Sequence, residues 1–255
     1  MRLALDHLHT VRICAPSDVR RAAESLRDAV STFIDGIIGA SHNIASGRPM
    51  VDADGNVLAT DVFGWPDDAD WWRMPQTAFD SPLPMACRYE SEPFWCNSEG
   101  IHPTRPNPFL KAINLADFEQ RTLITSAIVA PVHLPFGQIG AVLVSPRDRA
   151  HTDLTQEFET YGTIFGLFAR TFLASYVAVM TPAQRLPSQP QLRKREVECL
   201  RWVAQGKSDD EIGILLSITR STVRFHITKA MAKLDAVNRA QATLKATQLG
   251  YIKSV

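Results

Sequence analysis

The chain has 255 residues, of which 45% are hydrophobic and 21% charged, with 27 basic and 27 acidic side chains. This is the composition of a soluble globular protein, and it excludes collagen-like and intrinsically disordered structure. The four cysteines are scattered without a CxxC pair or a disulfide framework, which favours a reducing compartment. Residues 1–10 lack the continuous apolar stretch of a signal peptide, so we expect a cytoplasmic protein.

Charge is distributed unevenly along the chain. Residues 192–255 contain 12 basic and 6 acidic side chains, a net charge of +6, whereas residues 1–191 have a net charge of −6. Residues 181–191 contain three prolines and no periodic apolar pattern, as is typical of interdomain linkers. We therefore predict a first domain at residues 1–180, a linker at 181–191 and a basic domain at 192–255 that binds a polyanion.

Two helical patterns stand out in the first domain. Ser17 and Asp18 precede the first pattern and would cap that helix. Asp153 opens the second, longer pattern, and Gln156 is placed to complete a capping box. Residues 164–180 are interrupted by glycine and polar residues, fall short of the roughly 20 apolar residues of a membrane span, and should form a packed helix. The apolar positions of the two patterns are Val19, Ala22, Ala23, Leu26, Val30, Phe33 and Ile34, and Leu154, Phe158, Tyr161, Phe165, Phe168 and Phe172.

Strand patterns lie between these helices. Asp54-Gly55 within residues 50–62 predicts a tight hairpin, because this dipeptide suits a two-residue turn. Residues 126–133 and 138–145 flank a short Pro-Phe-Gly turn and predict a second hairpin. Helices around a central, mainly antiparallel sheet form a sandwich of the α+β class.

The basic domain shows only helical patterns, and we predict four helices there. The first covers residues 195–204 and ends at Gly206. The second follows Ser208, a cap succeeded by three acidic residues that suit the positive end of a helix dipole. Thr219 caps the third helix, and residues 240–249 form the fourth. The domain should therefore be all-α.

The second and third of these helices, joined by a short turn, form a helix-turn-helix pattern. Only a helix or a thin ribbon fits the major groove of DNA, and the third helix has the polar outer face that contact with base edges requires. The same charges could instead form the solvated face of a small bundle, because basic helix faces are common. The residues that we predict to contact DNA are Arg220, Ser221, Thr222, Arg224, Phe225, Thr228 and Lys229.

A more specific signal is the type and spacing of seven residues in this domain: Glu196, Leu200, Gly206, Thr222, Val223, Lys233 and Leu234. In these positions the last sixty or so residues closely resemble the LuxR-type DNA-binding domain. The resemblance implies a four-helix domain that binds double-stranded DNA as a dimer, with Arg224 in the place of a base-contacting arginine. Arg220, Ser221, Lys229 and Arg201 would then contact phosphates.

The first domain lacks the alternating strand and helix rhythm of a receiver domain. It resembles, in part, the autoinducer-binding domain of the quorum-sensing branch of the family. That resemblance implies an α-β-α sandwich that holds an acyl homoserine lactone between its sheet and its helices.

Aromatic residues are concentrated in one part of the first domain, and four of the five tryptophans lie within residues 65–95. Aromatic rings form apolar walls, and a buried indole N–H needs an acceptor, so the cluster suits an amphipathic ligand. The alternative is ordinary core, which most aromatic clusters form. The residues that we predict to bind the ligand are Phe63, Trp71, Trp72, Asp80, Tyr89, Trp95 and Leu143.

Asp80 and Trp95 stand fifteen residues apart, as do the ligand-amide acceptor and the pocket tryptophan of the family. The chain also departs from the family pattern. Ser81 separates Asp80 from the proline that directly follows it in the family, Trp71 lies closer to Asp80, and Leu143 stands where some relatives place a hydroxyl. These departures allow another amphipathic or aromatic molecule in place of a lactone.

We expect no enzyme, no cofactor and no metal. The sequence contains no GxGxxG, P-loop, HExxH or GxSxG motif. Cys87 or Cys96 with a histidine could form a thiol–imidazole pair, and Cys96 with His102 could bind a metal, but buried cysteines and satisfied histidines are commoner. Glu196 is interpreted as structural, either capping amide groups or pairing with a basic residue of the third helix.

The sequence therefore predicts a ligand-responsive transcriptional regulator of the LuxR type. Its expected partners are double-stranded DNA, a small-molecule effector, a second copy of the chain and RNA polymerase, with no membrane. The alternative is a ligand-independent dimeric regulator whose first domain serves only in dimerisation, since the long helix that begins near residue 153 could form an interface.

Overall fold

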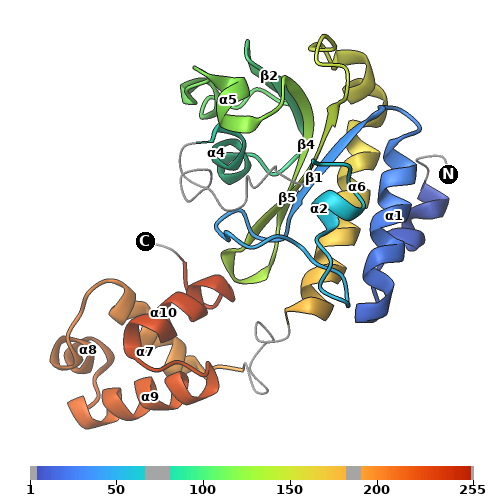
Figure 1. The fold of residues 1–255 in the computed structure, drawn as a ribbon. Helices are drawn as coiled ribbons and strands as arrows, with labels where there is room; N and C mark the ends of the chain where they lie inside the picture. The colour runs from blue at the N-terminus through green and yellow to red at the C-terminus, as the bar shows by residue number, and fades with distance from the viewer. Residues whose placement is uncertain (1–4, 67–80, 182–190, 254–255) are drawn as a thin grey trace. The chain divides into compact units, whose positions relative to one another are not determined.

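The computed structural model describes residues 5–66, 81–181 and 191–253, without the side chain of Phe136 (Figure 1). The described residues before the predicted linker form one compact unit, apart from residues 135–137, and residues 191–253 belong to a second. Residues 182–190, most of the predicted linker, lie outside the described part of the chain. The domain boundary therefore stays a prediction.

The first unit is built on a five-stranded sheet in which all neighbouring strands are antiparallel. The strand order is β1-β5-β4-β2-β3. The strands are β1 (Gly36–Ser41), β2 (Phe94–Asn97), β3 (Ile101–Pro103), β4 (Ser126–His133) and β5 (Ile139–Pro146). Strands β4 and β5 form the predicted hairpin around a short 3₁₀ turn at Pro135–Gly137.

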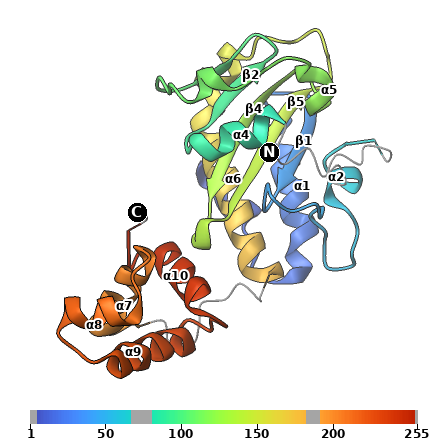
Figure 2. The same cartoon turned by 90° about the vertical axis from the view of Figure 1, so that its left-hand side faces the viewer.

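Helices cover both faces of this sheet (Figures 1 and 2). Among its described residues, the helices of the unit are α1 (Val19–Val30), α2 (Leu58–Asp61), α4 (Pro82–Tyr89), α5 (Phe118–Thr122) and α6 (Thr155–Met180), with 3₁₀ turns at Leu5–Val11, Pro16–Asp18 and Leu110–Ala112. Helix α6 packs on one face and α1 packs against α6, whereas α4 and α5 lie over the other. Residues 126–132 of β4 are all buried because both faces are covered. The predicted α-β-α sandwich is confirmed.

Helix α6 forms much of the core. By length and composition alone it could cross a bilayer, since an 18-residue window has a mean hydropathy of 1.5. However, Phe165, Phe168 and Phe172 of this helix are fully buried, and it contacts β4, β5 and α1. It therefore packs as the predicted core helix.

The predicted caps of the two long helices are wrong in detail. Helix α1 does begin directly after Asp18, but the carboxylate of Asp18 accepts hydrogen bonds from the backbone N–H groups of Cys14 and Ala15. The carboxylate of Asp153 accepts from the backbone N–H and the hydroxyl of Thr155 and makes no capping box with Gln156. Neither carboxylate therefore makes the capping interaction predicted for it.

The hairpin predicted within residues 50–62 is reduced to its turn. Gly55 has a φ of 88°, which suits glycine, and the buried carboxylate of Asp52 accepts from the N–H groups of Asp54 and Asn56. Beyond the turn, the only strand-like contact between described residues here is the bridge of Val51 with Val57. The chain then forms the short helix α2, in which Leu58 is buried.

The described part of the second unit consists of four helices, as predicted. They are α7 (Lys194–Ala204), α8 (Asp209–Leu216), α9 (Arg220–Lys233) and α10 (Arg239–Gln248). Gly206, with a φ of 79°, follows the end of α7. The core of the unit is formed by buried apolar residues of these helices, chiefly Cys199, Leu200, Ile212, Val223, Ile227, Ala230 and Leu234.

Candidate functional site

The turn between α8 and α9 is fixed by caps at both helix starts. The hydroxyl of Ser208 accepts from the N–H of Glu211, whose carboxylate accepts from the N–H of Ser208 at 2.8 Å, so the two form a capping box. Thr219 caps α9 by accepting from the N–H of Thr222 at 3.2 Å. The predicted caps of both helices are confirmed.

The same turn packs closely on α8 because Gly213 has no side chain. A Cβ atom on Gly213 would lie 2.8 Å from the carbonyl oxygen of Ile218, nearer than real Cβ atoms approach. Backbone contact of this kind holds α9 at a defined angle to α8. The pair is therefore a closely packed helix-turn-helix.

Helix α9 has one buried face and one exposed face. Val223, Ile227 and Ala230 are buried in the core of the second unit. Six of the seven residues predicted to contact DNA are exposed: Arg220, Ser221, Arg224, Phe225, Thr228 and Lys229. Thr222 is half-buried, and its hydroxyl bonds to that of Thr219 at 2.8 Å, so its role here is in the cap.

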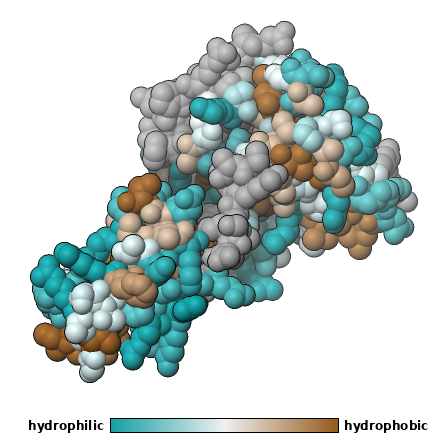
Figure 3. All heavy atoms as spheres, turned by 90° about the horizontal axis from the view of Figure 1, so that it is seen from below, coloured by the Kyte–Doolittle hydropathy of each residue, from teal (hydrophilic) through white to brown (hydrophobic). Residues whose placement is uncertain are grey.

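The exposed face of α9 carries an aromatic ring among its polar side chains. Phe225 is 57% exposed, and the ammonium of Lys229 lies 5.7 Å from the centre of its ring. In the view of Figure 3, hydrophilic side chains cover much of the second unit, at lower left, with separate hydrophobic groups between them. An exposed helix face with arginine, lysine, hydroxyls and one ring has the donors and the apolar contact that major-groove base edges accept.

Acidic residues at the start of α8 pair with the arginines of α9. Arg224 donates through Nε to Asp209 at 3.2 Å, and Arg220 lies 3.3 Å from Asp210. Asp209 also accepts from Arg239 of α10 at 3.0 Å. The sequence predicted only that the acidic residues after Ser208 interact favourably with the dipole of α8. It did not predict that they pair with arginines of α9.

Glu196 connects α7 to α9. Its carboxylate is buried and accepts from the N–H of Arg193 at 2.7 Å and from the ammonium of Lys233 at 2.8 Å. Burial alone would raise the pKa of Glu196, but the bonds from Lys233 and Arg193 outweigh it and hold this pKa below its usual value. Both parts of the structural interpretation, cap and ion pair, are confirmed.

Three of the seven residues predicted to bind the ligand, Trp71, Trp72 and Asp80, lie outside the described residues. The structure does not bring the other four together. The ring of Phe63 is 6.2 Å from that of Phe172 in α6, and Tyr89 is 55% exposed and stacks on Phe109 at 5.5 Å. Trp95 is buried and stacks on His102 at 4.0 Å.

Strand pairing places Trp95 and Leu143 on opposite faces of the sheet. Trp95 pairs with Ile128, which pairs with Val144, and side chains paired in this way share a face. Leu143, next to Val144, therefore points the other way, in the row of Val129 and Phe94. The two residues cannot both line one cavity.

Gly140 identifies the two faces. It shares a face with Val144, and a Cβ atom on it would lie 3.0 Å from the side chain of Leu173 in α6. Trp95 therefore faces the α6 layer, whereas Leu143, which is half-buried, faces the α4 layer. Sequence spacing could not reveal this, because the face of a residue depends on the register between strands that lie far apart in the chain.

Part of the tryptophan cluster is ordinary core. The indole of Trp65 donates to the carbonyl oxygen of Ile38 at 2.7 Å, and this ring and Phe63 are both buried in the main hydrophobic cluster. The alternative interpretation of the aromatic cluster therefore holds for these two residues.

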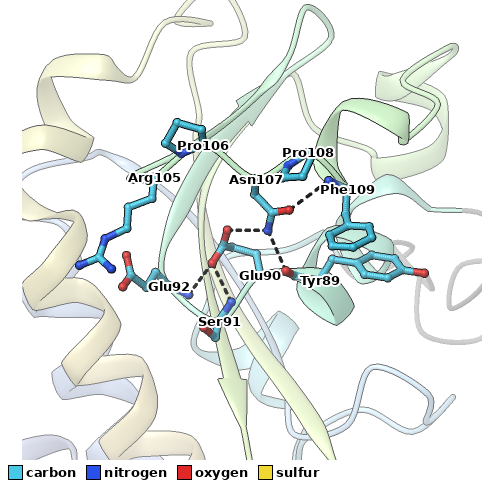
Figure 4. Close-up of a pocket in the computed structure, with 9 residues that line it drawn as sticks. All are labelled: Tyr89, Glu90, Ser91, Glu92, Arg105, Pro106, Asn107, Pro108 and Phe109. Atoms are coloured by element: carbon cyan, nitrogen blue, oxygen red, sulfur yellow. Dashed lines mark hydrogen bonds between the residues drawn. The ribbon is translucent and has the colours of Figure 1, made fainter.

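An open surface pocket of about 300 Å³ lies beside Tyr89 (Figure 4). Asn107 donates to the carbonyl oxygen of Tyr89 at 2.8 Å and to the carboxylate of Glu90 at 3.1 Å. That carboxylate also accepts from the N–H groups of Ser91 and Glu92. The polar groups that line this pocket are therefore largely hydrogen-bonded to one another. No sequence motif had indicated a pocket here.

The buried thiols are poorly placed for chemistry. Burial raises the pKa of Cys87 to about 12 and raises that of Cys96 as well, so both stay protonated. Within residues 5–66, 81–181 and 191–253, no group of three or more metal-binding side chains is found.

Comparison with known proteins extends this description. Residues 190–246 match the profile of the bacterial regulatory proteins of the luxR family. The transcriptional activator protein PhzR of Pseudomonas fluorescens is 33% identical over 116 residues, which are 46% of this chain and 47% of that protein. The quorum sensing-dependent transcriptional regulator RpaR of Rhodopseudomonas palustris is 52% identical over 62 residues, 24% of this chain and 26% of that protein. The matched stretches thus span less than half of either relative.

Solved structures resemble the chain over nearly its whole length. SdiA of Escherichia coli aligns with 97% of this chain and 95% of its own, at a TM-score of 0.55 and 19% identity. A structure of SdiA in complex with octanoyl-rac-glycerol aligns with 94% of this chain and 91% of its own, at a TM-score of 0.50 and 20% identity. At this identity the likeness shows the fold alone.

Proposed function

We propose that the protein, whose residues 190–246 belong to the luxR family of bacterial regulatory proteins, is a ligand-responsive transcriptional regulator. The observation that carries the proposal is the exposed face of α9. Helix α9, which is capped by Thr219 and joined to α7 by the ion pair of Lys233 with buried Glu196, presents arginine, lysine and hydroxyl side chains to solvent. In a domain of this family, such a face reads duplex DNA in the major groove, with two copies of the chain on two half-sites.

The first unit would bind the effector. Its fold is that of SdiA, and SdiA has been crystallised with an octanoyl glycerol, a molecule with an eight-carbon chain and a polar head. We place the corresponding ligand on the sheet face that carries Leu143, Val129 and Phe94, under the α4 layer. Trp71, Trp72 and Asp80 remain predicted members of that site.

The partial burial of β5 on this face supports the choice. Leu143 is half-buried, so part of its apolar surface is still available for a contact, whereas the α6 face is filled by fully buried phenylalanines. Leu143, rather than the fully buried Val129 and Phe94, would contact an acyl chain, and binding would shift the population of the dimer that presents its two α9 helices to DNA. The free energy of that shift is limited by the difference in ligand affinity between the two states.

Thermal denaturation of the full chain tests the ligand face, with N-octanoyl homoserine lactone and 1-octanoyl-rac-glycerol as probes. A probe at 100 times its Kd should stabilise the wild type by about 2.7 kcal/mol. Leu143→Asn, which keeps the approximate size but is polar, should reduce the shift at the same probe concentration. Trp95→Phe, on the α6 face, and Tyr89→Ala, on the surface, should keep it.

The reverse pattern, loss with Trp95→Phe and retention with Leu143→Asn, would place the ligand on the α6 face and contradict the assignment. If neither probe nor an extract of copurified small molecules shifts the melting temperature, the result favours a ligand-independent regulator whose first unit serves in dimerisation.

A further inference from the structure

Asp209, the first residue of α8, lies where three helices meet. Its side chain is 13% exposed, and each carboxylate oxygen has one arginine partner. One oxygen accepts from Nε of Arg224 in α9 at 3.2 Å, and the other accepts from Nη1 of Arg239 in α10 at 3.0 Å. Arg239 is held further by a bond of 3.3 Å to the carbonyl oxygen of Lys207. Asp209 is therefore a fixed carboxylate.

The bond to Asp209 uses the inner nitrogen of the Arg224 guanidinium and leaves the outer two free. Within the described part of the chain, no other hydrogen bond to Arg224 is present, and its side chain is 65% exposed. The two Nη atoms are the parallel donors with which arginine reads guanine, whose major-groove edge offers the acceptors O6 and N7. A carboxylate at Nε would thus aim the fork without competing for it.

We propose that Asp209 is a positioning residue that orients Arg224 for bidentate contact with a guanine, and so determines specificity at that base pair. The inference rests on the proposed function, since it requires α9 to enter the major groove. An arginine that is already held loses less side-chain freedom on binding, so more of the contact energy appears as discrimination between bases.

Asp210 provides a matched control. It is the next residue on the same helix, has the same charge, and pairs with another arginine of α9, Arg220, at 3.3 Å. Both side chains of this pair are largely exposed, at 64% and 56%. An exposed pair of this kind contributes little to holding its arginine in one conformation.

The positioning role and a purely electrostatic role predict opposite signs. A carboxylate near DNA repels phosphates, so removing its charge should raise the affinity for every duplex. If Asp209 acts only through charge, Asp209→Asn will therefore tighten binding to all sequences. If Asp209 positions Arg224, the same variant will weaken binding to the specific site and leave random-sequence affinity unchanged or higher.

The experiment uses the full chain and a duplex selected from a random library by the wild type. We expect Asp209→Asn to weaken binding to the selected duplex about three- to tenfold per half-site, which is part of the effect of losing the whole bidentate contact. The same variant should reduce the loss of affinity that follows when one guanine is replaced by adenine. Asp210→Asn should leave that loss unchanged. In an Arg224→Ala background, Asp209→Asn should cause no further loss.

A structural role of Asp209 is tested separately with Arg239→Gln, which removes the α10 partner and leaves the Arg224 bond in place. If this variant equally reduces the loss of affinity on replacement of guanine by adenine, Asp209 acts through helix packing and the proposal is overturned. The positioning proposal is also overturned, with the proposed function left standing, if the wild type prefers guanine to adenine at that base pair and Asp209→Asn keeps the full loss of affinity on that replacement. A wild type that prefers no duplex over random sequence would overturn the proposed function together with it.

Discussion

Arg224→Ala is expected to weaken binding of the full chain to its selected duplex by about 1 to 3 kcal/mol per half-site, the value of a good bidentate contact with a base. The arginine is exposed on α9, and its outer nitrogens have no partner among the described residues. The loss should appear as relaxed specificity at one base pair, measured as equal affinity for duplexes that differ only there.

Two further substitutions separate geometry from charge. Arg224→Lys keeps the positive charge but loses the planar fork, so it should keep the salt dependence of binding and lose the discrimination. Lys229→Ala should weaken binding to all sequences alike and reduce the salt slope by about one, as a phosphate contact would. If Arg224→Ala binds the selected duplex as tightly as the wild type, α9 does not read bases through this residue.

Lys233→Ala is expected to destabilise the second unit by about 3 to 5 kcal/mol, because it removes the partner of a buried charge. The carboxylate of Glu196 is 5% exposed and accepts from Lys233 at 2.8 Å. Hydrogen exchange of the backbone amides of α7 and α9, followed by mass spectrometry on the full chain, measures this loss separately from the first unit. Lys229→Ala, an exposed lysine of the same helix, is the matched control and should leave exchange unchanged.

The pH dependence of this destabilisation has a defined sign. The pKa of Glu196 is lowered in the folded chain, so the stabilisation by the pair is fully present above the ordinary glutamate pKa and is lost as pH falls through the lower, folded value. The stability difference between the wild type and Lys233→Ala should therefore shrink in acid. A difference that stays constant through the acid range in which glutamate protonates would show that the lysine acts through packing.

The exposed face of α9 was more predictable from sequence than the faces of the residues predicted to bind the ligand, for a physical reason. Which side of α9 is exposed follows from the 3.6-residue period of its own apolar residues, and the caps Ser208 and Thr219 bond within three residues of themselves. The face of Trp95 depends instead on its pairing with Ile128, 33 positions away, which sequence spacing does not determine. Family spacing therefore suggested Trp95 as a ligand residue, although pairing turns it toward α6.

One contact between helices, that of Glu196 with a basic residue of α9, was predicted from the sequence, whereas the pairing of the acidic residues of α8 with α9 was not. Three acidic residues after Ser208 suggested only a favourable interaction with the helix dipole. The close approach of α8 and α9, which the absence of a side chain at Gly213 allows, brings Asp209 to Arg224. Sequence separation of fifteen residues gave no sign of this contact.

Alternate residues of β5 differ in how much a substitution would disturb the packing of the sheet. Gly140, Val142 and Val144 are buried, on the face that meets α6, whereas Ile139, Ala141 and Leu143 are half-buried on the other face. Under the proposed function, substitutions in the second set would change which ligand is accepted without disturbing the packing of the first set. A receptor built in this way could diversify its inputs one side chain at a time while the scaffold that presents them persists.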